Sequence, residues 1–384
     1  MTIYLDYAAT TPVDPEVATT LADAMADPSM LANPSANHVA GRASEAHVSQ
    51  AANRLASLLG CEASQIVWTS GATEADNLAL LGAARYRARR GRHIVTMPTE
   101  HKAVSDTARQ LEREGFDVTW LTPGASGRLD LAAFEDSLRD DTQLVSIMHV
   151  NNETGVIQDI DAVGTLCRER DILFHVDAAQ SAGKLTVRFA DRPVDLLSVS
   201  AHKMYGPKGI GALVVADRPG CHVEPILFGG GQQGGRRPGT LPVPLIVAFG
   251  VAAERARSCM SADLELTRVL RDRLWAGIAD IDGVYLNGDD DNHYPGILNV
   301  GVNGIEGESL LLALEPICVA TGSACNSRDR EPSKVLRSMG RSDTEAQSAI
   351  RFSFGRFTRE KDIDSAVEQY RAAVERLRAM VPAA

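Results

Sequence analysis

The chain has 384 residues, 44% of them hydrophobic, which is enough to bury a full core and more than one compact unit usually needs. Its 39 Lys and Arg residues face 50 Asp and Glu residues, and the net charge of -11 argues against unassisted binding to a nucleic-acid backbone. The sequence contains neither a basic leader followed by an apolar stretch nor an apolar run of about 20 residues, so we expect a soluble, cytoplasmic protein.

Short apolar runs alternate with amphipathic stretches between about residues 60 and 215. This rhythm is typical of βαβ units and predicts an α/β fold with a largely parallel sheet covered on both faces. The strands are expected at 65–68, 93–97, 144–148, 172–176, 194–200 and 209–215.

The composition changes beyond these strands. A Gly-rich loop is expected between Leu227 and Pro242, then a long helix continuing toward Ala279, and then short strands such as 296–300. We therefore predict a large domain over residues 14–260. A smaller α+β domain is expected over residues 261–384, joined by an N-terminal arm at 1–13.

Polar residues follow several of the predicted strands, where the ligands of an open parallel sheet bind. The first strand leads into a turn at 69–76 with Gly71, whose free backbone N–H groups and following helix suit a phosphate. The same turn also fits an ordinary capping box with Thr73 as N-cap and Asp76 at the third helical position.

The other strand ends carry an imidazole, amides, a carboxylate and an amine. His101 and Asn152 follow two of the strands. Asp177 ends an apolar run and needs a cationic partner or a strong hydrogen-bond donor, and a protonated pyridine nitrogen is such a partner. Lys203 lies just past a strand end, and a neutral lysine amine forms a Schiff base with an aldehyde. Together these groups meet the needs of pyridoxal 5'-phosphate (PLP).

Each group also has an ordinary interpretation when taken alone. An isolated Lys203 fits a surface salt bridge, and an isolated His101 fits a structural role. His175 and Asp177 form a His-x-Asp pair that suggests a metal site, but further ligands are not evident, so we expect no metal.

The six cysteines are scattered, without Cys-x-x-Cys pairs or the dense spacing of a secreted disulfide framework. We therefore expect reduced thiols. Cys318 has apolar neighbours and fits a core position. Cys325 lies among small and polar residues, which predicts an exposed loop and makes it the candidate reactive thiol.

The motifs, in this order, resemble those of the cysteine desulfurases, in the class that includes the bacterial iron-sulfur assembly enzyme and the nitrogen-fixation desulfurase. The similarity covers essentially the whole chain and rests on the segments 6–12, 70–74, 99–101, 151–153, 200–203, 239–240, 322–325 and 350–353.

The resemblance implies the PLP-dependent aminotransferase-type fold (fold type I) and a homodimer. By this resemblance Lys203 holds PLP, Asp177 pairs with its ring nitrogen and His101 stacks on the ring and assists proton transfer. Arg351, helped by Asn33, holds the carboxylate of the substrate L-cysteine. The implied cofactor-binding residues are Ala72, Thr73, His101, Asn152, Asp177, Gln180, Ser200, His202, Lys203 and Thr240, the last reaching the phosphate of the neighbouring subunit.

The activity implied by the resemblance is conversion of L-cysteine to L-alanine, with the sulfur held as a persulfide on Cys325. An acceptor protein then takes the sulfur, for iron-sulfur assembly, tRNA thiolation or DNA phosphorothioation.

Two alternatives remain open. Another fold type I PLP enzyme, such as a selenocysteine lyase or an aminotransferase, would use Lys203 without Cys325, and a non-catalytic sulfur-carrier partner would keep only the fold.

The chain departs from the housekeeping enzymes in two places. Gln232 and Gln233 follow the glycines where those enzymes usually carry His and Glu, and the segment 237–244 is more similar to desulfurases that supply DNA phosphorothioate modification. The chain also stops at Ala384 without the extended tail with which housekeeping relatives dock their scaffold, so we expect delivery to that scaffold to be in doubt.

Overall fold

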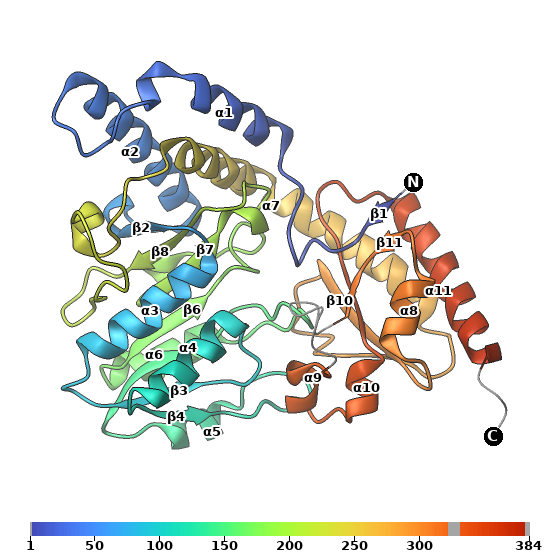
Figure 1. Cartoon of the computed structure of the whole chain (residues 1–384). Coiled ribbons are helices and arrows are strands. Elements are labelled where there is room, and N and C mark those ends of the chain that lie inside the picture. Colours follow the sequence, from blue (N-terminus) through green and yellow to red (C-terminus); the bar gives the residue numbers. More distant parts are fainter. Residues whose placement is uncertain (1, 322–330, 381–384) are drawn as a thin grey trace.

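A seven-stranded sheet forms the centre of the larger part of the molecule in the computed structural model, which describes residues 2–321 and 331–380 (Figure 1). The strand order is β2-β8-β7-β6-β5-β3-β4, and β8 runs antiparallel to both of its neighbours while the other pairs are parallel. The strands are β2 (Ile66–Thr69), β3 (His93–Thr96), β4 (Asp117–Trp120), β5 (Thr142–Ser146), β6 (Leu173–Asp177), β7 (Leu196–Ser200) and β8 (Gly211–Val215).

The alternation of side chains along each strand divides the core into two layers. Trp68 faces the layer formed with α2 and α7, whereas its neighbour Val67 faces the layer formed with α3 and α4. Helices therefore cover both faces, as the sequence predicted. These helices are α2 (Val39–Leu59), α3 (Ala72–Tyr86), α4 (Lys102–Arg113), α6 (Ile160–Glu169) and α7 (Val243–Ile278), with the shorter α1 (Pro15–Ala26) and α5 (Leu131–Ser137) at the periphery.

The smaller part has its own sheet, of order β12-β13-β10-β9, with the N-terminal strand β1 pairing in parallel with β11 beside it. Its core gathers Leu5, Phe352 and Tyr370 around this sheet. Its elements are β1 (Ile3–Tyr4), β9 (Val284–Leu286), β10 (Ile297–Val302), α8 (Gly307–Ala313), β11 (Ile317–Cys318), β12 (Ala320–Thr321), α9 (Lys334–Ser338), α10 (Asp343–Gln347), β13 (Ile350–Ser353) and α11 (Glu360–Met380).

Helix α7 runs from the large sheet to the small one (Figure 1). Its first half, with Ile246 and Phe249, packs in the core of the large sheet, and its second half, with Leu270 and Leu274, packs in the other core. The predicted division into residues 14–260 and 261–384 stays a prediction, and this change of core along α7 supports it. Within the described ranges, no helix is long and apolar enough to cross a membrane.

Arg356 joins three separate segments where the two parts meet. Its guanidinium donates to Asp14 (2.7 Å), the N-cap of α1, and to Asp263 of α7 (2.8 Å). It also lies 4.3 Å from the ring centroid of Tyr205, shortly after Lys203. The side chains of Arg356, Asp14 and Asp263 are 12%, 5% and 15% exposed, so the two carboxylates have little water to compensate for a lost partner.

We predict that Arg356→Met lowers the free energy of unfolding by about 3 kcal/mol, because Asp263 loses its cation and Asp14 keeps only the more distant Arg255, 3.8 Å away, among the described residues. The matched control is Arg273→Met. Arg273 pairs with Asp364 and Glu360 through side chains that are 43%, 48% and 61% exposed, so its loss should cost less than about 1 kcal/mol. Urea unfolding followed by circular dichroism measures both, and equal losses would contradict the assignment of Arg356 as a junction.

Candidate active site

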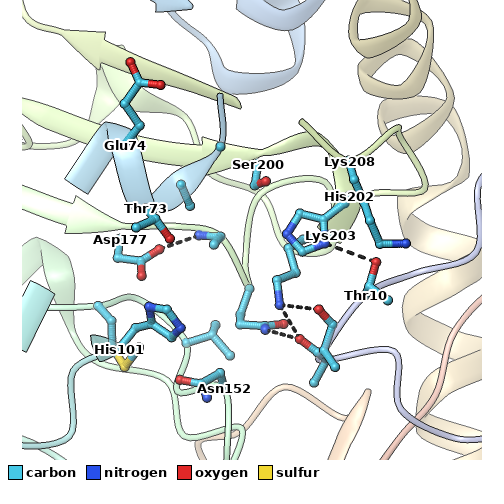
Figure 2. A pocket seen from close by; sticks show the side chains of 18 of the residues that line it. Thr10, Thr73, Glu74, His101, Asn152, Asp177, Ser200, His202, Lys203 and Lys208 are labelled. Atoms are coloured by element: carbon cyan, nitrogen blue, oxygen red, sulfur yellow. Dashed lines mark hydrogen bonds between the residues drawn. The ribbon is translucent and has the colours of Figure 1, made fainter. Parts of the chain in front are cut away.

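A cavity of about 590 Å³ opens at the carboxyl ends of the central strands (Figure 2). This volume lies within the usual range for small-molecule sites. Most of the residues singled out from the sequence line this one cavity: Ala72, Thr73, His101, Asn152, Asp177, Gln180, Ser200, His202, Lys203 and Arg351. Asn33 and Thr240 are exposed and are not among the lining residues, and Cys325 lies outside the described residues.

One end of the cavity is rich in hydrogen-bond donors. Helix α3 begins at Ala72 directly after the turn, so the N–H groups of its first turn have no helical partner and face an anion favourably. The Ser200 hydroxyl is buried and has no hydrogen-bond partner in the described part of the chain. A Cβ at Gly211 would lie 2.6 Å from the Cα of Gly71, so only glycine lets β8 approach this turn so closely.

The capping-box interpretation of this turn was wrong. Gly71 is the N-cap of α3, without a side-chain cap, and Thr73 lies inside the helix. Asp76 is fully buried, 3.5 Å from His175, instead of accepting from the helix end. Asp76 therefore points into the protein, and the first turn of α3 is left open toward the cavity. The polar residues of this segment do not form a helix cap.

The other end of the cavity is acidic. Asp177 closes β6, and its Oδ1 accepts from the backbone N–H of Ala179 (2.8 Å). Burial, reinforced by the charge of Asp76, raises the pKa of Asp177 to about 6 against the opposing effect of His101. Since burial disfavours the bare carboxylate, a protonated ring nitrogen is a suitable partner for it.

Lys203 follows β7 in a short 3-10 turn, and its amine contacts the N-terminal arm. Its Nζ donates to the carbonyl oxygens of Ala8 (2.5 Å) and Ala9 (2.8 Å), as the dashed lines in Figure 2 show. The side chain of Gln180 donates to the same Ala8 oxygen (2.8 Å). The arm therefore forms one wall of the cavity, a contact between residues 195 positions apart.

Two imidazoles flank these groups and differ in their surroundings. The Nδ1 of His101 accepts from the backbone N–H of Ala103, so His101 caps α4 and a neutral ring carries its proton on Nε2. Burial, together with the charge of Lys203, lowers the pKa of His202 to about 4, and its Nδ1 lies 3.1 Å from the hydroxyl of Thr10. His202 is therefore a neutral hydrogen-bonding group near neutral pH.

Arg351 on β13 enters the cavity from the smaller part of the molecule. Its guanidinium donates to the carbonyl of Asn152 (2.8 Å) and to Asp6 (2.7 Å), while its buried Nε has no partner among the described residues. Sequence reasoning assigned no individual role to Asp6, because nothing local links it to a residue 345 positions away. The guanidinium is held in place with donor capacity remaining, as a carboxylate-binding group requires.

His175 does not offer a metal site. Its two ring nitrogens lie 2.8 and 2.9 Å from the hydroxyls of Ser146 and Ser198, so neither is left for a metal. Over the residues that the structure describes, no group of three or more His, Cys, Asp or Glu side chains is arranged to hold a metal ion.

The Gly-rich loop is fastened to the edge of the large sheet. The Gln233 amide accepts from the N–H of Trp68 (2.6 Å) and donates to its carbonyl (2.9 Å), on the edge strand β2. Arg237 forms an ion pair with Glu74 of α3 (2.6 Å), next to Thr73 of the cavity. These contacts hold the loop that carries the exposed Thr240.

Taken together, the residues present fit PLP: donors for a phosphate at one end, a buried carboxylate at the other and an amine between them. Sequence reasoning missed Asp6 and the buried Lys184, which contacts Gln180, and it assigned Asp76 to a helix cap instead of the buried position that it occupies.

Comparison with known proteins gives a consistent result. The family model for aminotransferase class-V matches residues 3–366. The cysteine desulfurase IscS of Pectobacterium atrosepticum is 53% identical over 381 residues, which is 99% of this chain and 94% of the relative. Among solved structures, a NifS-like protein superposes with a TM-score of 0.91 at 33% identity, over 98% of this chain and 100% of the other. A structure described as SspA in complex with cysteine gives 0.82 at 38% identity, over 93% and 100%.

Glu153, beside the cavity, generates a pH-dependent prediction. Burial raises its pKa to about 7, against the opposing effects of Ser333, which donates to its Oε2 at 2.5 Å, and of Arg351. The native state therefore retains a proton that the unfolded state loses, so the carboxyl lowers stability progressively as the pH rises from its ordinary pKa to about 7.

We predict that Glu153→Gln becomes more stable relative to the wild type over this interval, by up to about 3 kcal/mol at its upper end. Urea unfolding of both proteins at a series of pH values measures the difference, in which the titrations of other groups cancel. A difference that does not change with pH would show that the Glu153 pKa is not raised.

Proposed function

Because the chain belongs to the aminotransferase class-V family and is a PLP-dependent cysteine desulfurase, we propose that Lys203 holds the cofactor, Asp177 pairs with its ring nitrogen and Cys325 receives the sulfur. The observation that carries this proposal is the convergence of Lys203, Asp177, Ser200 and Arg351 on one cavity from three separate segments, the end of β6, the end of β7 with the turn after it, and β13. None of these groups needs the others for packing alone.

The chemistry that PLP supplies when bound is withdrawal of electrons from the α-carbon of the substrate. The protein residues position the reactants around that atom. Arg351 binds the substrate carboxylate, with its orientation fixed by Asp6 and the Asn152 carbonyl. Asp177 keeps a proton on the ring nitrogen, and the amine of Lys203 moves the proton at the α-carbon.

Sulfur transfer then requires a thiolate. The thiolate of Cys325 attacks the substrate sulfur, the substrate C–S bond breaks, and protonation of the carbon yields alanine while the sulfur remains on Cys325 as a persulfide. The described cysteines are all unpaired. Burial raises the pKa of Cys61 and Cys221 to about 12, so neither supplies a thiolate near neutral pH.

We further propose a homodimer in which Thr240 serves the phosphate of the neighbouring subunit. Thr240 is exposed, lies outside its own cavity and belongs to a loop anchored to the sheet edge. Large apolar side chains are also exposed, with Phe228 at 86% and Leu31 at 87%. We propose that the second subunit covers Phe228, which lies in the same Gly-rich loop as Thr240.

For the sulfur, we propose an acceptor protein, with iron-sulfur assembly as the first candidate because the 53% identical relative is named IscS. A DNA-phosphorothioation partner is the second, favoured by the segment 237–244. The net charge of -11 favours a protein acceptor over direct nucleic-acid binding, and we propose a cytoplasmic location. Transfer assays that offer each partner in turn would separate the two pathways.

We predict that Cys325→Ser abolishes the sulfur adduct that brief incubation with L-cysteine places on the peptide containing residue 325, while cofactor binding persists. Lys203→Ala should lower kcat/KM for alanine formation by about 10³-fold or more, because the α-proton loses its base. Peptide mass spectrometry without reductant and an alanine assay measure these effects. An adduct that forms on another cysteine in the wild type would refute the assignment of Cys325.

The role of Thr240 across a dimer is tested by mixing subunits. We expect Thr240→Val to weaken PLP binding about tenfold, through loss of a hydrogen bond to a charged group. A heterodimer of a Lys203→Ala subunit and a Thr240→Val subunit should nevertheless contain one site of wild-type affinity and activity, since the intact Thr240 serves the intact Lys203. A heterodimer without any intact site would mean that Thr240 acts within its own subunit.

A further inference from the structure

Lys184 is a buried lysine immediately behind the cavity wall. It is 8% exposed, and its Nζ donates to Oε1 of Gln180 (2.9 Å) and lies 5.5 Å from the ring centroid of Tyr294. Among the described residues it forms no ion pair with a carboxylate. Burial of an ammonium group without a counter-charge is costly, so its retention at this place calls for a specific role.

The contact determines which way the Gln180 amide points. An ammonium group has donors only, so it can face the amide oxygen but not the amide nitrogen. With Oε1 directed at Lys184, the Nε2 side is directed at the Ala8 carbonyl (2.8 Å) and the cavity that Gln180 lines. An amide nitrogen carries two hydrogens, and Ala8 uses one of them.

We propose that Lys184 is a positioning residue, which holds the Gln180 amide so that it presents an N–H, and not its carbonyl, to the ring oxygen of the cofactor. The inference rests on the proposed function, in which PLP occupies the cavity, and on the family resemblance, which implies that Gln180 contacts the ring hydroxyl of the cofactor. A donor stabilises the ionised form of a ring hydroxyl, whereas a carbonyl in the same place would repel it.

The surroundings of Lys184 make this control dependent on its charge. Burial, together with the charges of Lys203 and Arg351, lowers the pKa of Lys184 to about 7. The third group that faces it is the phenol of Tyr294, whose pKa burial raises, so this phenol stays neutral. A neutral amine has a lone pair and does not itself discriminate between the two amide orientations, which leaves the Ala8 carbonyl as the remaining determinant. The contribution of Lys184 is therefore strongest when its amine is protonated.

The test compares Lys184→Met with Gln180→Ala, the double variant and the exposed Lys361→Met as a matched control, all with intact Lys203. Two quantities are measured: the dissociation constant for PLP and the pKa of the pH-dependent absorbance of bound PLP. We expect Lys184→Met to weaken PLP binding about fivefold and to raise that pKa, because the ring oxygen loses its donor. In the Gln180→Ala background the Lys184 substitution should have no further effect.

A Lys184→Met variant that matches the wild type, or an effect that persists in the Gln180→Ala background, would overturn the inference. In the latter case Lys184 would act through its charge alone. If Gln180→Ala binds PLP as tightly as the wild type, the role of Gln180 is overturned as well. If the wild type failed to bind PLP at all, the proposed function itself would fail, so the two failures are distinct.

Gln180→Glu provides a second test that leaves Lys184 in place, should Lys184→Met not fold. The carboxylate still accepts from Lys184 but presents only acceptors to the cavity. It should therefore weaken PLP binding at least as much as Lys184→Met, and more than Gln180→Ala, which loses the same contact with the Ala8 carbonyl but presents no acceptor to the cavity. Wild-type affinity in Gln180→Glu would contradict the requirement for an N–H at this position.

Discussion

The carbonyl oxygen of Ala8 is the point where the N-terminal arm, the large sheet and the cavity meet. It accepts from Lys203 and from Gln180, which follow β7 and β6, and the backbone N–H of Ala8 donates to the Ser353 hydroxyl on β13 (2.9 Å). The two backbone groups of this one residue therefore link both sheets. The position of the reactive amine depends on an arm whose strand β1 is anchored in the smaller part of the molecule. The geometry of the site therefore depends on how the two parts of the molecule pack together.

The charges around this point are separated along the cavity. Cationic groups, among them Lys203 and Arg351, lie near the arm, whereas Asp177 lies at the far end over the buried Asp76 and Glu100. Burial raises the pKa of Asp177 and of Glu100 and lowers that of His202, so the isolated protein disfavours several of the usual charges. A ligand with an anionic end and a protonatable ring nitrogen would compensate for this cost, so the residues proposed for the chemistry would also contribute to binding.

Local patterns in the sequence predicted the parts of the fold that local physics decides. The buried strands of the large sheet appear as apolar runs, and all six predicted ones were confirmed. Strand β4 was missed because it is an edge strand, half exposed and with a charged residue at its start, so it lacks such a run. The direction of β8 was also beyond reach, since an apolar run does not reveal whether its neighbours are parallel. Contacts such as that of Arg351 with Asp6 depend on how distant segments pack, and only the structure supplies them.

The Gly-rich loop shows how a departure from the family pattern is accommodated. A carboxylate at position 233 could only accept, whereas the amide of Gln233 both accepts from and donates to the backbone of Trp68, as a neighbouring strand would. The loop therefore closes an otherwise unpaired sheet edge with a side chain. Because Arg237 fastens the same loop to Glu74, the segment carrying Thr240 is held by contacts within its own subunit. In the proposed dimer this segment would need no ordering at the moment of association, so less conformational entropy would oppose the association of the two subunits.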